Sequence, residues 1–159
     1  MTYDVHRREV NERPILSVRA VVRTDELVAF FDAAVAEMRA YLAQLSVTAA
    51  GPPGSLWHSA PGEIPDASDV ETYLPLERPV PSSGRMTGRA LPAGLEAFTV
   101  HAGNYDTMGS AFDAVWNWLQ ANGYQMDGPP ADVVLVGPGD TAAPDDYRTE
   151  IVYRLTNDQ

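Results

Sequence analysis

Two glutamates, Glu150 and Glu71, occupy matching places in two segments whose residues alternate in polarity, 146–155 and 69–76. Successive side chains of a β-strand point to opposite faces, so each glutamate stands on the face opposite the more apolar one. A carboxylate beside aromatic surface attracts organic cations, and two carboxylates in one cavity supply an acid and a base. The pattern therefore predicts a site for cationic ligands or a hydrolytic site, and the residues alone leave both open.

The histidines do not extend this chemistry to metals. His6, His58 and His101 are far apart in the sequence, no His-x-x-x-His pair occurs, and there is no cysteine. Because metal sites need clustered ligands, no metal site is predicted. The sequence also lacks a phosphate-binding or dinucleotide-binding fingerprint, so no cofactor is expected. His58, beside Trp57, is kept as a candidate for an acid–base or hydrogen-bonding role.

The composition is that of a packed, acidic domain. The 159 residues are 45% hydrophobic and carry a formal net charge of −11. An excess of negative charge disfavours nucleic-acid binding, which depends on cationic contacts to phosphate, and it attracts cationic ligands over long range. There is no signal-peptide core at the N-terminus and no apolar run long enough for a membrane span. A cytoplasmic protein without membrane or nucleic-acid partners is expected, and its oligomeric state is left open.

The two glutamate segments end two repeats of one pattern. The whole chain, 1–159, is predicted to be a single domain made of pseudo-repeats 1–78 and 83–156, each with the order strand-strand-helix-strand-strand. The predicted fold class is α+β, with about eight mainly antiparallel strands, two long helices on one face and a ligand groove between the halves. The expected strands are 3–10, 15–22, 55–59, 69–76, 85–91, 95–102, 132–136 and 146–155, with one helix over about 25–45 and another that opens at 103–106 and ends at 122–123.

Helical periodicity divides the aromatic residues of the second helix between core and surface. Its apolar stripe contains Val115, Leu119 and Trp116, so Trp116 is assigned to the core. Trp118 lies toward the edge of the stripe and remains a candidate for ligand contact. The first helix has a comparable apolar stripe over about five turns.

The second repeat contains an ordered set of segments: Leu91-Pro92-Ala93-Gly94, Val100-His101-Ala102-Gly103-Asn104-Tyr105, Ala114-Val115-Trp116-Asn117-Trp118-Leu119, Asn122-Gly123-Tyr124, Gly128-Pro129-Pro130 and Tyr147-Arg148-Thr149-Glu150-Ile151. This set resembles the GyrI-like small-molecule-binding family, which includes the effector-binding domains of bacterial multidrug-responsive transcription activators. The resemblance spans residues 3–155. It implies a duplicated βαββ-type module whose groove takes lipophilic, often cationic and aromatic compounds. No DNA-binding region is expected before Tyr3.

The resemblance also implies roles for individual residues. Glu150 occupies the position of the family's strand glutamate, which supplies charge complementarity to the ligand. Tyr147 stands where many members have tryptophan, and Tyr105 where they have a tyrosine after a turn. Val134 replaces an aromatic residue of the family, and Trp57 in the first repeat is expected to compensate for it. The candidate ligand-binding residues are Glu150, Tyr147, Tyr105, Trp57, Glu71, Tyr73, Trp118, Phe98 and His58.

Each candidate also has a purely structural interpretation. Glu150 could be a surface strand residue paired with Arg148 or Arg154. Glu71 could be its structural repeat, solvated or hydrogen-bonded without any ligand. Any single aromatic residue is by default a core residue, because aromatic side chains dominate cores as well as binding sites.

The leading hypothesis is a stand-alone domain that binds bulky, apolar, cationic aromatic small molecules and sequesters them. One alternative is a hydrolase of reactive hydrophobic electrophiles, such as cyclopropane-bearing toxins, with Glu150 or Glu71 activating water. Another is a protein-interaction module of the gyrase-inhibitor type, which contacts a partner through the groove or a strand edge. The expected partners are lipophilic small molecules.

Overall fold

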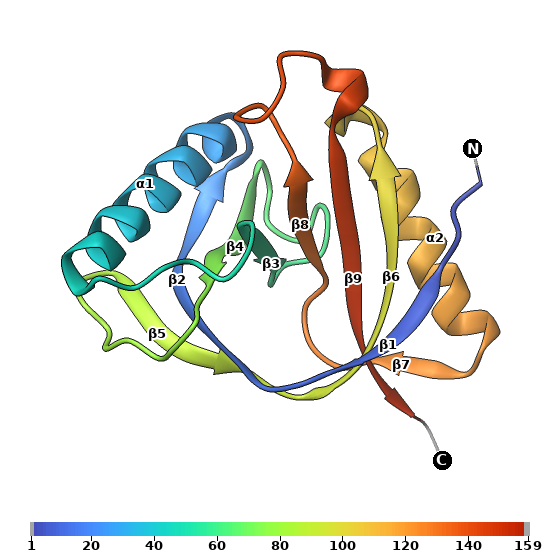
Figure 1. The fold of residues 1–159 in the computed structure, drawn as a ribbon. Coiled ribbons are helices and arrows are strands. Elements are labelled where there is room, and N and C mark those ends of the chain that lie inside the picture. The colour runs from blue at the N-terminus through green and yellow to red at the C-terminus, as the bar shows by residue number, and fades with distance from the viewer. Residues whose placement is uncertain (1, 158–159) are drawn as a thin grey trace. The chain divides into compact units, whose positions relative to one another are not determined.

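The computed structural model describes residues 2–157, which form nine β-strands, two α-helices and three short 3-10 turns. They divide into two compact units. The continuous unit is residues 12–92, and the split unit joins the residues up to 11 to the chain from residue 93 onward. Every strand pair within either unit is antiparallel, and each unit has one long helix (Figure 1), which confirms the predicted α+β class. No helix within residues 2–157 is long and apolar enough to cross a membrane.

The continuous unit consists of β2 (Arg13–Arg23), α1 (Leu27–Leu45), β3 (Gly54–Trp57), β4 (Ala67–Pro75) and β5 (Met86–Leu91). Its sheet has the strand order β3-β4-β2-β5. β2 pairs with β4 along one edge and with β5 along the other, and its run of β-branched and apolar residues suits such a central strand. α1 follows a 3-10 turn and ends at Ser46, whose left-handed backbone (φ 55°) closes the helix.

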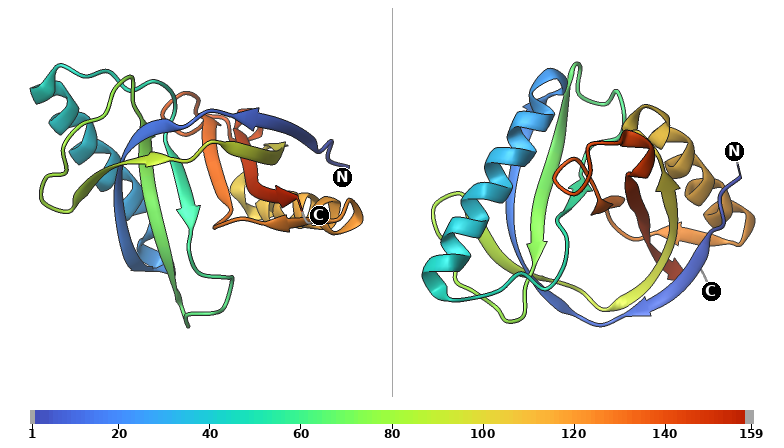
Figure 2. Two further views of the ribbon diagram at one scale, coloured as in Figure 1. Left: turned by 90° about the horizontal axis from the view of Figure 1, so that it is seen from below. Right: turned by 45° about the horizontal axis from the view of Figure 1, so that its top comes forward.

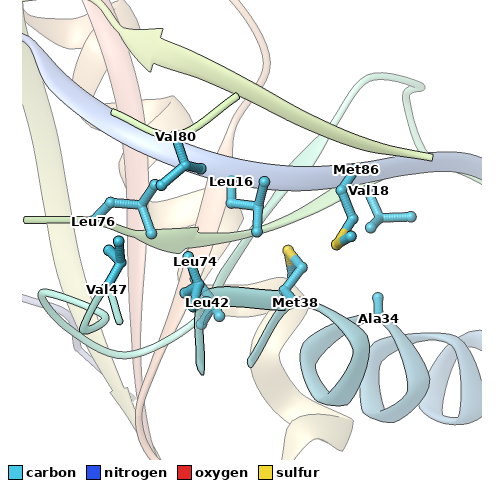
Figure 3. Packing of buried hydrophobic residues seen from close by; sticks show 10 residues of the cluster. All are labelled: Leu16, Val18, Ala34, Met38, Leu42, Val47, Leu74, Leu76, Val80 and Met86. Carbon is cyan, nitrogen blue, oxygen red and sulfur yellow. The ribbon is translucent and has the colours of Figure 1, made fainter. Parts of the chain in front are cut away.

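The core of the continuous unit lies between α1 and one face of this sheet (Figure 3). Ala34, Met38 and Leu42 recur every four residues along α1, so they share one side of the helix. They are at most 3% exposed and belong to one cluster with Leu16 and Leu74 of the sheet, which are fully buried. Burying a side chain such as leucine contributes roughly 1.5–3 kcal/mol, so this stripe holds the helix on the sheet. The apolar stripe predicted for the first helix is confirmed.

The split unit consists of β1 (His6–Val10), β6 (Gly94–Ala102), α2 (Met108–Ala121), β7 (Tyr124–Met126), β8 (Ala131–Val136) and β9 (Arg148–Asn157). Its sheet has the order β1-β6-β9-β8, and β7 pairs with the last residues of β9. β7 was not predicted, because three residues are too few to display an alternating pattern.

The alternation predicted for the last strand is confirmed in β9. The residues on the face that α2 covers are each at most 7% exposed: Thr149, Ile151, Tyr153 and Leu155. All but the threonine belong to the apolar cluster of this unit, to which α2 contributes. The other face of β9 is therefore the one that carries Glu150.

The core assignment of Trp116 is wrong. Ala111, Val115 and Leu119 of α2 are completely buried, whereas 43% of Trp116 is exposed. Residue 116 lies about 100° further around the helix than residue 115, which turns it away from the stripe that contacts the sheet. Its ring contacts that of the core residue Tyr153, with the centroids 6.5 Å apart and the planes tilted by 41°.

The first strand of each predicted repeat pairs with a strand of the other repeat. β1 precedes β2 in the sequence but pairs with β6, and β5 precedes β6 but pairs with β2 (Figures 1 and 2). The pairing of β1 with β6 has the same register as the pairing of β5 with β2. Arg8 lies opposite Glu96 in the first pair, and Arg89 lies opposite Ile15 at the equivalent place in the second. Each exchange thus places an arginine on the sheet face that carries the strand glutamate of that unit.

Candidate functional site

Glu71 lies in the middle of β4, on the sheet face turned away from α1. The residue is charged but only 4% exposed. Arg89 donates two hydrogen bonds to its carboxylate, from Nη2 at 2.7 Å and from Nε at 2.9 Å. Ser17 Oγ donates a third at 2.6 Å, and His58 Nε2 lies 2.9 Å from the other oxygen. Each carboxylate oxygen therefore has two partners, which fills the acceptor capacity of the group.

This network fixes the ionisation of Glu71. Burial by itself raises the pKa of a carboxyl group, because it penalises the charged form. At Glu71 the effect of burial is outweighed by the hydrogen bonds from Arg89, Ser17 and His58 and by the charge of Arg89, so the pKa is lowered to about 2. A group that loses its proton so readily is a weak base, which makes Glu71 a poor candidate for activating water.

Tyr73 shares the Glu71 face, and its ring lies across Gly54 of the neighbouring strand. A Cβ atom at residue 54 would come 2.5 Å from the end of this ring. Because Tyr73 is only 7% exposed, Gly54→Ala is expected to destabilise the protein by about 2 kcal/mol. Chemical denaturation measures the change, and Gly109→Ala, at a position with open space, is the matched control. An unchanged midpoint for Gly54→Ala would mean that the ring moves aside at no cost.

Trp57 does not lie beside Glu71 within the continuous unit. Its register partner is Val70, a core residue, so the side chain points to the helix side of the sheet. There its ring meets the ring of Phe31 from α1 edge-on, with centroids 6.1 Å apart. His58, one residue later, reaches Glu71 on the opposite face. The structure therefore joins Glu71 and His58 and places Trp57 on the other side.

Glu150 occupies the equivalent position in the split unit, on the face of β9 turned away from α2. Its carboxylate forms a bidentate pair with Arg8, whose Nη2 and Nη1 atoms lie 2.7 and 3.2 Å from the two oxygens. The Nε atom of the same arginine donates to Glu96 at 3.1 Å. Within residues 2–157, Arg8 is the one donor to Glu150, so each carboxylate oxygen keeps an acceptor site. The Glu150 side chain is 14% exposed.

The alternative interpretation, in which Glu150 is a surface residue paired with Arg148 or Arg154, is wrong about the partner. Arg148 donates to backbone oxygens near the start of β9, and Arg154 pairs with Asp127. The actual partner, Arg8, stands 142 positions away in the sequence. It reaches Glu150 because β1 completes the sheet of the split unit.

Phe98 completes the surroundings of Arg8. The guanidinium carbon lies 4.1 Å from the centre of the Phe98 ring, well within the range of cation–π attraction. Val100 stands opposite Glu150 in the register and is 42% exposed, so it adds apolar area. Together Glu150, Arg8, Glu96, Phe98 and Val100 form what we call the Glu150 surface.

The remaining aromatic candidates of the split unit stack in pairs of their own. Tyr105 and Tyr147 lie with ring centroids 5.3 Å apart and planes 30° apart. Burial raises the pKa of Tyr105, and the neighbouring Tyr147 adds to this. Trp118 stacks on Tyr124 at 5.6 Å and packs against the core on the α2 side of the sheet. Among the described residues, no ring contact links either pair to Phe98, whose ring contacts His6.

A depression of about 440 Å³ lies near the end of α2, on the side of the sheet where Trp118 packs. Two of its lining residues, Trp116 and Met126, are large apolar side chains more than 40% exposed. Its lining contains no charged residue, unlike the Glu150 surface. The lining residues are Trp116, Gln120, Gly123, Tyr124, Gln125 and Met126.

The two glutamates thus belong to one arrangement built twice. In each unit the strand glutamate meets an arginine from the exchanged strand, Arg89 at Glu71 and Arg8 at Glu150. Sequence reasoning found both glutamates but neither arginine, because an alternating pattern does not tell which strand lies beside which. Arg8 and Arg89 hold the same place in the two predicted repeats, and this repetition is the signal that could have found them.

The family follows from the sequence match. Residues 3–156 match the model of the GyrI-like small molecule binding domain, so the chain belongs to this family of small-molecule-binding domains. The membership predicted from the ordered segments of the second repeat is confirmed. No curated protein matches the chain.

Solved structures share the fold at low sequence identity. An EcmrR–DNA complex matches with a TM-score of 0.85 at 19% identity over 98% of this chain, which spans 58% of the EcmrR chain. A hydrolase encoded by lin2189 from Listeria innocua has a TM-score of 0.71 at 14% identity, covering 96% of this chain and 91% of that one. SAV2435 bound to tetraphenylphosphonium has a TM-score of 0.62 at 11% identity, covering 98% and 94%. At these identities the likeness establishes the fold.

Proposed function

We propose that this domain binds bulky aromatic cations on the Glu150 surface and thereby sequesters them. The observation that supports the proposal is that this surface already binds one flat, delocalised cation, the guanidinium of Arg8. The guanidinium of Arg8 lies 4.1 Å from the centre of the Phe98 ring and pairs with Glu150 at 2.7 Å. The same groups suit a ligand, because its charge would meet the carboxylate while its rings would meet Phe98 and Val100.

The hydrogen bonds of the two glutamates favour Glu150 as the residue that meets the ligand. Glu71 is 4% exposed and has two partners at each oxygen, so it offers no acceptor site. Glu150 has one partner at each oxygen, and its side chain is more exposed. We therefore expect a ligand cation to bind next to Glu150, whereas Glu71 stabilises the fold of the continuous unit.

Structures of the same fold support both the ligand class and the main alternative. SAV2435 was solved with tetraphenylphosphonium, a bulky aromatic cation, whereas the lin2189 protein is described as a hydrolase. Hydrolysis would need a carboxylate that accepts a proton. The pKa of about 2 at Glu71 makes that residue a weak base, which favours binding over hydrolysis at Glu71.

Glu150→Gln is expected to weaken the binding of tetraphenylphosphonium about tenfold, because the amide keeps the shape of the side chain and removes its charge. Tetraphenylborate has nearly the same shape and the opposite charge, so the same variant should not weaken its binding. Isothermal titration calorimetry with both ions measures this preference. Asp113→Asn is the matched control, since it removes the same charge from an exposed position on α2, on the other side of the sheet.

Equal affinities of the wild-type protein and Glu150→Gln for tetraphenylphosphonium would exclude the Glu150 surface. Loss of binding in Trp116→Ala would instead place the ligand in the depression near the end of α2. Mass spectrometry of a cyclopropane-bearing compound after incubation separates binding from hydrolysis, because a binding protein returns the compound intact.

A further inference from the structure

We propose that Arg8 is a specificity-determining residue, whose guanidinium occupies the place of the ligand cation and has to leave before a cation binds at Glu150. This rests on the proposed function and adds a built-in competitor to it. In consequence, the Glu150 surface admits cations that bring aromatic rings and rejects ligands that bring charge alone.

The continuous unit contains the same arginine–glutamate pair in a locked form. Arg89 is paired with a carboxylate that is also held by Ser17 and His58. Glu71 is 4% exposed, so moving the arginine away would leave a buried charge with Ser17 and His58 as its remaining partners. Uncompensated buried charge is strongly unfavourable, and this pair is therefore expected to stay closed.

Within the described residues, the positions equivalent to those of the donors Ser17 and His58 hold no polar side chain beside Glu150. Ser17 and Phe98 hold equivalent register positions next to their glutamates. His58 bonds through its backbone to Asp69, two residues before Glu71, and its counterpart Val136 lies opposite Arg148, two residues before Glu150. Two polar side chains are thus replaced by an aromatic ring and an aliphatic chain. Among residues 2–157, Arg8 is the one donor to Glu150, and it lies beside apolar surface on which ligand rings can pack.

Arg8 is placed where it can move. It belongs to β1, a five-residue strand at the edge of the sheet, and its side chain is 35% exposed. Rotation about its side-chain bonds carries the guanidinium into water without breaking the backbone hydrogen bonds of β1. The guanidinium stays charged at any physiological pH, so the site opens only by displacement. The contact between its Nε atom and Glu96 gives it a second partner on that face.

Displacement selects the ligand by chemistry. The incoming cation has to compensate, by its charge and its rings, for the lost ion pair between Arg8 and Glu150 and for the lost stacking on Phe98. A small ammonium ion supplies charge without rings, and an uncharged aromatic compound supplies rings without charge. Ammonium or phosphonium ions that carry aryl groups supply both, so they are the class that this surface favours.

Arg8→Met is the direct test, because methionine keeps an apolar chain at this position and removes the charge. With the competitor gone, tetraphenylphosphonium is expected to bind about fivefold more tightly or better, and adding Glu150→Gln should remove this gain. Arg7→Met is the matched control, since Arg7 loses the same charge from the same strand but contacts Tyr124 on the other face. Its effect is expected to stay below about twofold, because distant surface charges are screened.

A measurement on the wild-type protein covers the case in which Arg8→Met does not fold. The guanidinium of Arg8 lies over the Phe98 ring, whose ring current displaces the NMR signals of nearby side-chain protons. Saturation with tetraphenylphosphonium is expected to return the Arg8 signals to ordinary arginine positions. Signals that stay displaced at saturation would mean that Arg8 has not left.

The outcomes distinguish the two proposals. If neither the wild-type protein nor Arg8→Met binds tetraphenylphosphonium, the proposed function fails and the role of Arg8 fails with it. If the wild-type protein binds but Arg8→Met binds equally or more weakly, only the role of Arg8 is overturned. Tighter binding by Arg8→Met and not by Arg7→Met, with the gain lost in the double variant, supports both.

Discussion

Arg89→Met is expected to lower the free energy of unfolding by about 3 kcal/mol, the largest effect that we expect from removing a single charge. The substitution removes two of the hydrogen bonds to Glu71 and leaves a carboxylate, 4% exposed, with Ser17 and His58 as its remaining partners. Breaking a buried ion pair from one side typically costs about 3–5 kcal/mol. The Arg89 side chain is 36% exposed, so we expect a loss of stability at the lower end of this range.

Urea unfolding of the wild-type protein and the variant measures this difference. Arg19→Met is the matched control, because Arg19 also forms two hydrogen bonds to a carboxylate of β4, that of Asp69. Its side chain is 53% exposed, so the loss should stay below about 1 kcal/mol. Equal losses in the two variants would contradict the view that burial of Glu71 makes its ion pair important.

Acidification is expected to remove a similar amount of stability through Glu71. The pKa of this residue falls from the ordinary 4.5 to about 2 in the folded protein. A lowered carboxyl pKa stabilises the folded state fully above the unfolded value of 4.5, and the contribution is lost as the pH falls through about 2. The difference between the two pKa values corresponds to about 3 kcal/mol.

Denaturant unfolding of the wild-type protein and Glu71→Gln between about pH 6 and pH 2 tests this expectation. The wild-type stability should fall more steeply over that interval, because the glutamine has no proton to take up. Parallel pH profiles of the two proteins would refute the assignment of the acid-sensitive group to Glu71. Asp113→Asn, which changes an exposed carboxylate, should follow the wild-type profile.

Features that depend on neighbours along the chain were predictable from the sequence. Alternation alone predicted that Ile151 is buried and that Glu150 faces the other way, because parity sets the direction of a strand side chain. The match between the two glutamate segments predicted that Glu71 and Glu150 hold equivalent positions, and the registers of β4 and β9 agree with this.

Features that depend on which strands meet were not predictable. Arg8 and Arg89 reach their glutamates through exchanged strands, and the local pattern carries no information about that pairing. Trp57 depends on register, since a shift of one residue would turn its side chain to the other face. The ligand-binding roles of the candidate residues, and the groove expected between the repeats, stay predictions.

During translation, β1 emerges from the ribosome long before β6 and β9, which hold the partners of Arg8, have been synthesised. Arg8 bonds to residues 88 and 142 positions further along the chain, and closing contacts over such distances has a high entropic cost and slows folding. Residues 12–92, in contrast, contain every strand of the continuous unit and emerge as one stretch. The nascent chain can thus assemble the continuous unit early, whereas Glu150 can pair with Arg8 only after the 142 positions that separate them have been synthesised.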